Sequence, residues 1–194
     1  MNETELAETT VARICHDLVS PMGAIGNGLE LLAMTGQPPT PELSLISQSA
    51  ENANARLRFF RVAFGGASAG ATMAARDSRA IVGAMFGSGR LEVDWQVADD
   101  SLRTELKLAF LLLLCFETTL PRGGLVQVRR ADRLWHLWTD AERGIDAGKW
   151  ANLLAGGPTP TPPDKVHFTL AAHHARHLGR QLDICSDSGA SVSF

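Results

Sequence analysis

The sequence has few cysteines, no extended basic segment and no long apolar run, and each absence argues against a class of protein. Its three cysteines are odd in number, far apart and without metal-ligand spacing, which favours reduced thiols over a disulfide framework. A formal net charge of -3 gives no positive footprint for nucleic acid. The longest apolar run, Leu108 to Phe116, is too short to span a bilayer, and the N-terminus lacks signal-peptide regions. We expect a cytoplasmic protein that binds neither membranes nor nucleic acid.

A chain of 194 residues with 45% hydrophobic content can bury one good core or two small ones, and its pattern favours two. Residues 1–70 read as a helical hairpin, with a first helix over 5–34 and a break at Gly36 to Pro39. Thr40 is suited to cap a second helix, with Pro41 at its first position. The small residues at 65–71 are typical of a joint between modules.

Apolar side chains of the second helix recur three and four residues apart, which is the pattern of a bundle seam. They are Leu43, Ile46, Ala50, Ala53, Leu57, Phe60 and Phe64. Two helices alone would leave much of this seam in water, whereas two hairpins make a four-helix bundle. The first module is therefore predicted to form a homodimer.

Residues 71–194 show mixed periodicity, which predicts an α/β sandwich and, with the hairpin, an α+β chain. Helices are expected over residues 77–86, 101–119, 147–154 and 164–178. Strands are expected over residues 91–97, 125–130, 134–139, 181–186 and 190–194, with hairpin turns at Ala131-Asp132 and at Asp187-Ser188-Gly189.

The helical wheel places His16 on the solvent face of the first helix, opposite its apolar stripe, where a histidine of the core would not lie. At about 100° per residue, six apolar side chains of the first helix share one direction, and His16 lies about 160° from it. The apolar stripe consists of Ile14, Leu18, Met22, Ile25, Leu29 and Leu32. The segment His16-Asp17-Leu18, followed by Ser20-Pro21, resembles the phosphoacceptor box of two-component histidine kinases.

The side chains around His16 fit a site for phosphoryl transfer between proteins. A neutral imidazole is an available nucleophile near neutral pH, and the Asp17 carboxylate can orient the ring or take its other proton. Ser20, Gly23 and Asn27 share the direction of His16 and leave room for a partner. Arg13 is placed in the same docking face. The alternative is that glycines here only ease helix packing.

The second module resembles the ATP-binding domain of histidine kinases, with its pocket altered. Cys115 stands where that family carries a magnesium-binding asparagine, and a thiol is a poor ligand for Mg²⁺. In Asp140 to Gly144, Glu142 replaces the first glycine of the adenine box. Lys165 and His167 stand where the family has its last glycines before the final kinase helix, so a phosphate-binding backbone nest is not expected. We expect no nucleotide, metal or other cofactor on this chain.

A phosphoacceptor bundle joined to a degenerate kinase-like domain resembles the ChpT-type histidine phosphotransferases of α-proteobacteria, with its most specific match at residues 16–32. The resemblance implies that His16 passes a phosphoryl group from the receiver aspartate of a hybrid kinase to response regulators, with Mg²⁺ supplied by the receiver. Two alternatives stay open: an ATP-dependent kinase with an unusual pocket, and a non-catalytic dimeric adaptor. His173 and His177 could bind a metal, although an exposed helix face is the simpler interpretation.

Overall fold

A computed structural model describes residues 3–35, 40–68, 70–140, 150, 162–185 and 190–194. The chain divides into two compact units, Met1–Gly66 and Ala67–Phe194. The division falls directly after Gly65-Gly66, inside the small-residue segment that the sequence marks as a joint.

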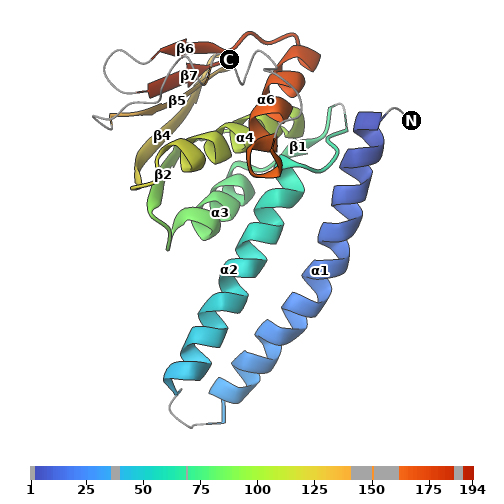
Figure 1. The fold of residues 1–194 in the computed structure, drawn as a ribbon, viewed down its shortest axis with the longest axis vertical. Helices are drawn as coiled ribbons and strands as arrows, with labels where there is room; N and C mark the ends of the chain where they lie inside the picture. Colours follow the sequence, from blue (N-terminus) through green and yellow to red (C-terminus); the bar gives the residue numbers. More distant parts are fainter. Residues whose placement is uncertain (1–2, 36–39, 69, 141–149, 151–161, 186–189) are drawn as a thin grey trace. The chain divides into compact units, whose positions relative to one another are not determined.

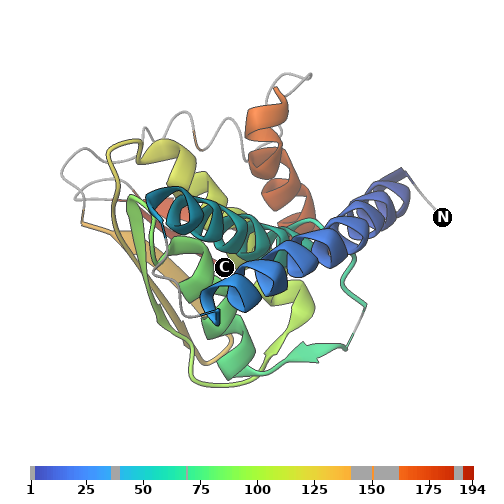
Figure 2. The same cartoon turned by 90° about the horizontal axis from the view of Figure 1, so that it is seen from below.

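The N-terminal unit is a helical hairpin of α1 (Glu3–Ala33) and α2 (Pro41–Ala63), which run side by side in both views (Figures 1 and 2). The α1 helix continues through Pro21. Thr40 is the N-cap of α2, and its hydroxyl accepts a hydrogen bond from the backbone N–H of Leu43 over 3.3 Å. Pro41 occupies the first turn, where its missing N–H is not needed. The predicted hairpin and cap are therefore confirmed.

The two helices contact each other through small and polar side chains more than the predicted stripe implied. Cys15 and Ala50 are buried, and the Asn54 side-chain amide donates to the carbonyl of Met22 over 3.3 Å. Met22 and Leu29 are half-buried. The other members of the α1 stripe are exposed in the single chain, at 53% for Ile14, 46% for Leu18, 47% for Ile25 and 53% for Leu32. The stripe thus divides into two rows. The inner row is Met22 and Leu29, and the outer row is Ile14, Leu18, Ile25 and Leu32.

The C-terminal unit is a two-layer arrangement of a mixed sheet and helices on one of its faces (Figures 1 and 2). In spatial order, the five strands are β2 (Leu91–Gln96), β4 (Gly124–Ala131), β5 (Leu134–Thr139), β7 (Ala190–Ser193) and β6 (Asp183–Cys185). The β2–β4 pair is parallel and the other pairs are antiparallel. The helices are α3 (Ala75–Phe86), α4 (Arg103–Thr119) and α6 (Val166–His177), and a two-stranded sheet joins β1 (Thr72–Met73) to β3 (Ser101–Leu102).

The core of this unit lies between α4 and the inner face of the sheet. All side chains of α4 from Glu105 to Phe116 are buried. Trp95 and Trp135 of the sheet contact the helix on one side, and α6 contacts it on another. Trp95 and Trp135 meet on the inner face with ring centroids 5.7 Å apart. The predicted α/β module and the overall class are confirmed.

Several predicted boundaries were wrong for local reasons. Ser101 belongs to β3 and pairs with Met73, so α4 begins two residues later. The hairpin turn between β4 and β5 is centred on Asp132 and Arg133, whose positive φ angles of 48° and 70° are those of a type I′ turn. A 3₁₀ turn over Pro163–Lys165 precedes α6, which starts at Val166 instead of residue 164. The expected helix over 147–154, apart from Trp150, and the turn at 187–189 lie outside the described residues.

Candidate functional site

His16 lies in the middle of α1 and projects into solvent. Its side chain is 78% exposed, whereas the neighbouring Cys15 is 4% exposed. This difference follows from the 100° step between successive helical residues. Burial raises the pKa of the Cys15 thiol, and the positive charge of Arg61 offsets part of this increase. The imidazole is therefore the accessible side chain of this pair, as the helical wheel predicted, and the adjacent thiol is buried.

Asp17 lies between two basic side chains of the same turn. Its Oδ1 atom lies 3.2 Å from Nδ1 of His16, and its Oδ2 atom accepts a hydrogen bond from Nε of Arg13 over 2.8 Å. The hydrogen bond with His16 and the positive charge of Arg13 lower the pKa of the Asp17 carboxyl from its usual value. Asp17 is thus held in its ionised form, which accepts hydrogen bonds and donates none.

An ionised Asp17 fixes which ring nitrogen of His16 carries the proton. Because the carboxylate only accepts, Nδ1 must be the protonated nitrogen whenever the 3.2 Å contact is a hydrogen bond. In the neutral ring, Nε2 then keeps its lone pair. The unprotonated Nε2 atom therefore lies on an exposed helix face, and the Asp17 carboxylate lies beside the opposite nitrogen, Nδ1.

The face around His16 is open. Ser20 and Asn27 are exposed, and a Cβ added to Gly23 would meet nothing within 4 Å. The same is true of Gly28, while a Cβ at Gly26 would touch the Asn54 amide only at 4.0 Å. Packing between α1 and α2 therefore does not require these glycines, which weakens the interpretation that they only ease helix packing.

In the C-terminal unit, the position compared with a kinase asparagine does not suit Mg²⁺. Cys115 is fully buried, and burial raises the pKa of its thiol well above the ordinary value. A protonated thiol in an apolar core is not a ligand for a hard cation that prefers oxygen. The residues present at this position thus do not fit a magnesium nucleotide.

Side chains of α4 and α6 contact each other directly. Thr118 and His167 share a hydrogen bond, with Oγ1 3.0 Å from Nε2. Burial lowers the pKa of His167 to about 4, so this histidine is neutral at physiological pH. Trp150 packs against both helices, with ring centroids 5.2 Å from Phe116 and 5.5 Å from Phe168. This packing lies at the C-terminal half of α4, where Phe116 contacts Trp150 and Thr118 contacts His167.

The remaining predicted positions are scattered. Asp140 is exposed at the end of β5, Lys165 is exposed, and Glu142 and Gly144 lie outside the described residues. His173 is exposed, while the buried His174 is hydrogen bonded through Nε2 to the carbonyl of Thr104 over 2.8 Å. Among the described residues, no group of His, Cys, Asp and Glu side chains could hold a metal ion.

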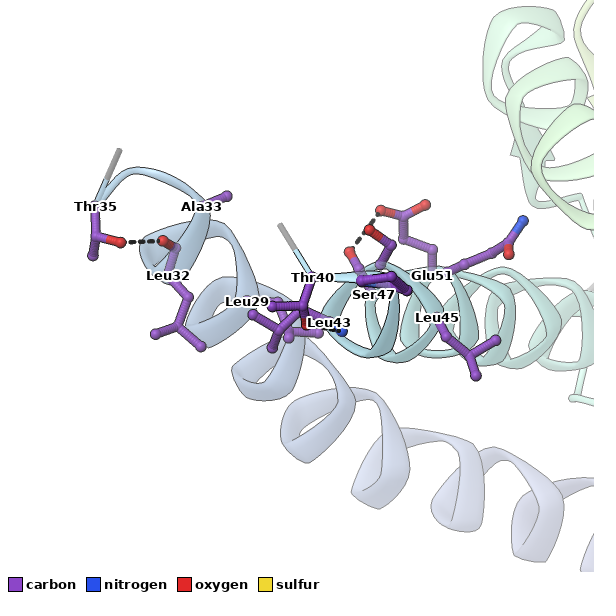
Figure 3. A pocket seen from close by; sticks show the side chains of 12 residues that line it. Leu29, Leu32, Ala33, Thr35, Thr40, Leu43, Leu45, Ser47 and Glu51 are labelled. Carbon is purple, nitrogen blue, oxygen red and sulfur yellow. Dashed lines mark hydrogen bonds between the residues drawn. The ribbon is translucent and has the colours of Figure 1, made fainter. Parts of the chain in front are cut away.

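A hollow between the ends of α1 and α2 is separate from the His16 face. Figure 3 shows Leu29 and Leu32 from α1 facing it together with Leu43 from α2. Leu29 is 13 residues from His16. This places it about 20 Å away along the helix axis. The hollow therefore takes no part in the chemistry of His16.

Two contacts of these sites were not predicted from the sequence. The Arg13–Asp17 hydrogen bond had a readable signal, because residues four apart lie on one helix face. The Thr118–His167 pair had none, since 49 residues separate its members and only the packing of α4 on α6 brings them together.

The family model of the histidine phosphotransferase C-terminal domain matches residues 75–189, which is more than half of the chain. The chain belongs to this family. The protein phosphotransferase ChpT of Brucella abortus (strain 2308) is 40% identical over 131 residues, which are 66% of this chain and 62% of that relative. The match thus spans less than two thirds of the ChpT sequence.

Solved structures agree with the family assignment. A bacterial phosphotransferase solved at 1.7 Å superposes with a TM-score of 0.67 and 27% identity, over 98% of this chain and 95% of that one. Full-length ShkA in complex with AMPPNP superposes with a TM-score of 0.50 and 14% identity, over 97% of this chain and 45% of that one, which shows a shared fold. Within the described residues, no helix is long and apolar enough to cross a membrane.

Proposed function

We propose that this chain is a histidine phosphotransferase that carries the phosphoryl group on Nε2 of His16. The observation that carries the proposal is the exposed imidazole whose Nδ1 lies 3.2 Å from an ionised Asp17, in a chain of the histidine phosphotransferase family. A nucleophile that serves two successive protein partners has to be accessible to both. At 78% exposure, the His16 side chain meets this requirement.

In the forward step, the Nε2 lone pair attacks the phosphorus of an aspartyl phosphate on a receiver domain. A P–N bond forms, the P–O bond to the receiver aspartate breaks, and the electron pair leaves on that carboxylate. The ring becomes positively charged, and Asp17 beside Nδ1 stabilises the charge or takes the proton. A second receiver aspartate reverses these events, and the phosphoryl group leaves the imidazole.

The partners are receiver domains of a hybrid kinase and of response regulators, and they supply the Mg²⁺. Phosphoryl transfer depends mainly on positioning and on stabilisation of the phosphoryl oxygens. The assignment of the ion to the partner is part of this proposal. Within the described residues, no group of three or more His, Cys, Asp and Glu side chains could hold a metal ion. The open surface over Gly23 gives a receiver room to approach the imidazole.

The active form is proposed to be a homodimer. The outer row of α1, formed by Ile14, Leu18, Ile25 and Leu32, is about half exposed in the single chain. Leu45 and Ile46 of α2 are similarly exposed, at 64% and 50%. Contiguous apolar exposure of this kind marks an interface. A second hairpin that covers it completes a four-helix bundle and leaves His16, on the opposite side of α1, in solvent.

Autophosphorylation from ATP is the competing proposal, favoured by the shared fold with ShkA. The buried Cys115 thiol and the packed Thr118–His167 pair argue against a bound magnesium nucleotide. The deciding experiment offers the protein two labelled donors in separate reactions. One is a receiver domain phosphorylated on its aspartate with labelled acetyl phosphate, and the other is labelled Mg-ATP.

We expect acid-labile phosphate on the chain from the receiver and none from ATP. His16→Gln keeps a polar side chain without the nucleophilic ring, so it should lose the label while its free energy of unfolding changes by no more than about 0.5 kcal/mol. His173→Gln, another exposed helical histidine, is the matched control and should keep the label. Labelling from ATP would favour the kinase, and a label that survives His16→Gln would move the nucleophile elsewhere.

A further inference from the structure

Three side chains from one turn of α1 form a continuous series of hydrogen bonds. Nε of Arg13 donates to Oδ2 of Asp17 over 2.8 Å, and Oδ1 of the same carboxylate lies 3.2 Å from Nδ1 of His16. Each carboxylate oxygen therefore has a different partner. The guanidinium acts on the imidazole through the carboxylate between them.

Helix stability gives little reason for the Arg13–Asp17 pair. Its side chains are 73% and 49% exposed, and exposed pairs at this spacing contribute little to folding. The order also matters, since an acidic residue four positions before a basic one is the more favourable arrangement along a helix. Here the basic residue comes first. The geometry around His16 gives the pair a better explanation.

We propose that Arg13 is a positioning residue for phosphotransfer, which holds Asp17 so that its Oδ1 stays against Nδ1 of His16 and the Nε2 lone pair faces the incoming phosphoryl group. This inference rests on the proposed function of His16. An exposed aspartate can rotate freely about its side-chain bonds, and a directed N–H···O bond from a guanidinium restricts that rotation. The arginine thereby selects one ring tautomer without touching the ring.

The electrostatic effect acts in the same direction. The charge of Arg13 contributes to the lowered pKa of Asp17, and so favours the ionised carboxylate. Only that form is restricted to accepting, which makes Nδ1 the donor. Asp17 stays ionised near neutral pH even without Arg13, because the ordinary pKa of its carboxyl is already 3.8. Loss of Arg13 should therefore act by loosening the carboxylate, and a looser contact with Nδ1 weakens the preference for a proton on that nitrogen.

The test uses phosphoramidate, a small donor that requires no docking surface. Nε2 of His16 attacks its phosphorus, the P–N bond of the donor breaks, and ammonia leaves. In the full chain, Arg13→Gln should slow this reaction about 10-fold, which is the lower end of the loss seen when a residue that orients a metal-ligating side chain is removed. Arg13→Lys retains a charged donor without the planar fork and should recover part of the rate. An Arg13 that only contacts receivers would leave the phosphoramidate rate unchanged in both variants, and that result would overturn the proposal.

A double-mutant cycle shows whether Arg13 acts through Asp17. Asp17→Asn alone should slow the reaction, and adding Arg13→Gln to it should bring no further loss, because the residue through which the arginine acts is already gone. An equal loss from Arg13→Gln in both backgrounds would contradict the proposal. Nitrogen NMR of the His16 ring gives an independent readout, since Arg13→Gln should reduce the fraction of neutral ring that carries its proton on Nδ1.

Arg76→Gln is the matched control. Arg76 is an exposed helical arginine beside an acidic residue, with Nε 3.5 Å from Oδ1 of Asp77, and no histidine belongs to that pair. It should leave the phosphoramidate rate unchanged. His16→Gln distinguishes the proposed function of His16 from the positioning role of Arg13. Phosphate labelling that persists in this variant contradicts the proposed function. A label that requires His16 but is indifferent to Arg13 contradicts only the positioning role.

Discussion

Gly23 lies on the same face of α1 as His16, two turns along the helix, and has no side chain. A Cβ at Gly23 would meet nothing within 4 Å, so the hairpin itself gives no steric reason for a glycine there. Glycine in a helix interior is unfavourable by about 0.5–1 kcal/mol relative to alanine. Gly23 lowers the stability of the helix and avoids no steric clash within the hairpin. We therefore attribute it to the approach of a partner protein to this face.

Gly23→Ala should therefore stabilise the protein and impair its function. We expect the free energy of unfolding to rise by about 0.5–1 kcal/mol, because alanine restricts the unfolded chain and suits the helix. Transfer from a phosphorylated receiver should become slower, since the added methyl group lies where the partner approaches. Denaturant unfolding and single-turnover labelling measure the two effects.

The matched control for this substitution is Gly83→Ala in α3, where a Cβ also meets nothing within 4 Å. It should raise stability by a similar amount and leave transfer unchanged. Unimpaired transfer in Gly23→Ala would show that the open surface beside His16 is not where the receiver docks.

At the scale of elements, α1 presents two different faces. One carries the exposed His16, and the other carries the outer apolar row of Ile14, Leu18, Ile25 and Leu32. The hydrogen bond from Asn54 to the carbonyl of Met22 and the buried Cys15 belong to the side of α1 that faces α2. The outer row thus has a separate task, which we assign to the dimer.

Ile25→Glu tests this assignment with little risk to the hairpin, because the Ile25 side chain is already 47% exposed. A charge placed in a buried dimer seam would be desolvated, so the variant should sediment as a monomer at micromolar concentration while the wild type sediments as a dimer. Leu125→Glu, at 47% exposure on β4, is the matched control and should remain dimeric. A monomeric wild-type protein would contradict the bundle.

Periodicity predicted most helices and strands of the chain because each buries one face, as in α2 and in the β4–β5 hairpin. It failed where pairing partners were distant. Ser101 reads as a helix start, and only its pairing with Met73 makes it a strand residue. At the candidate site, the exposure of His16 was predictable from one helix alone. The contact between Thr118 and His167 was not, since it depends on the packing of α4 against α6.

At the scale of the whole molecule, the residues matched by the family model and the proposed phosphoacceptor, His16, belong to different units. The matched residues 75–189 lie in the unit Ala67–Phe194, and His16 lies in Met1–Gly66. The C-terminal unit can be followed by itself in solution, because it contains all four tryptophans of the chain, Trp95, Trp135, Trp138 and Trp150. Tryptophan fluorescence therefore follows the unfolding of that unit alone.

This signal makes the buried His167 testable through pH. Its folded pKa of about 4 is below the ordinary value of 6.5, so the unfolded chain takes up a proton at a higher pH than the folded one. Between these two values the unfolded state binds more protons, and stability must fall as the pH falls. From about pH 7 to about pH 5, the C-terminal unit should lose roughly 1–2 kcal/mol through this histidine.

His167→Gln removes the titration and keeps a polar group within reach of Thr118. Urea unfolding followed by tryptophan fluorescence should then show a smaller loss of stability on acidification than the wild type, even if the variant is less stable at neutral pH. His173→Gln, on the exposed side of the same helix, should keep the wild-type pH dependence. Equal pH dependence in His167→Gln and the wild type would mean that His167 accepts its proton as readily in the folded unit as in the unfolded chain, and that the space between α4 and α6 admits water.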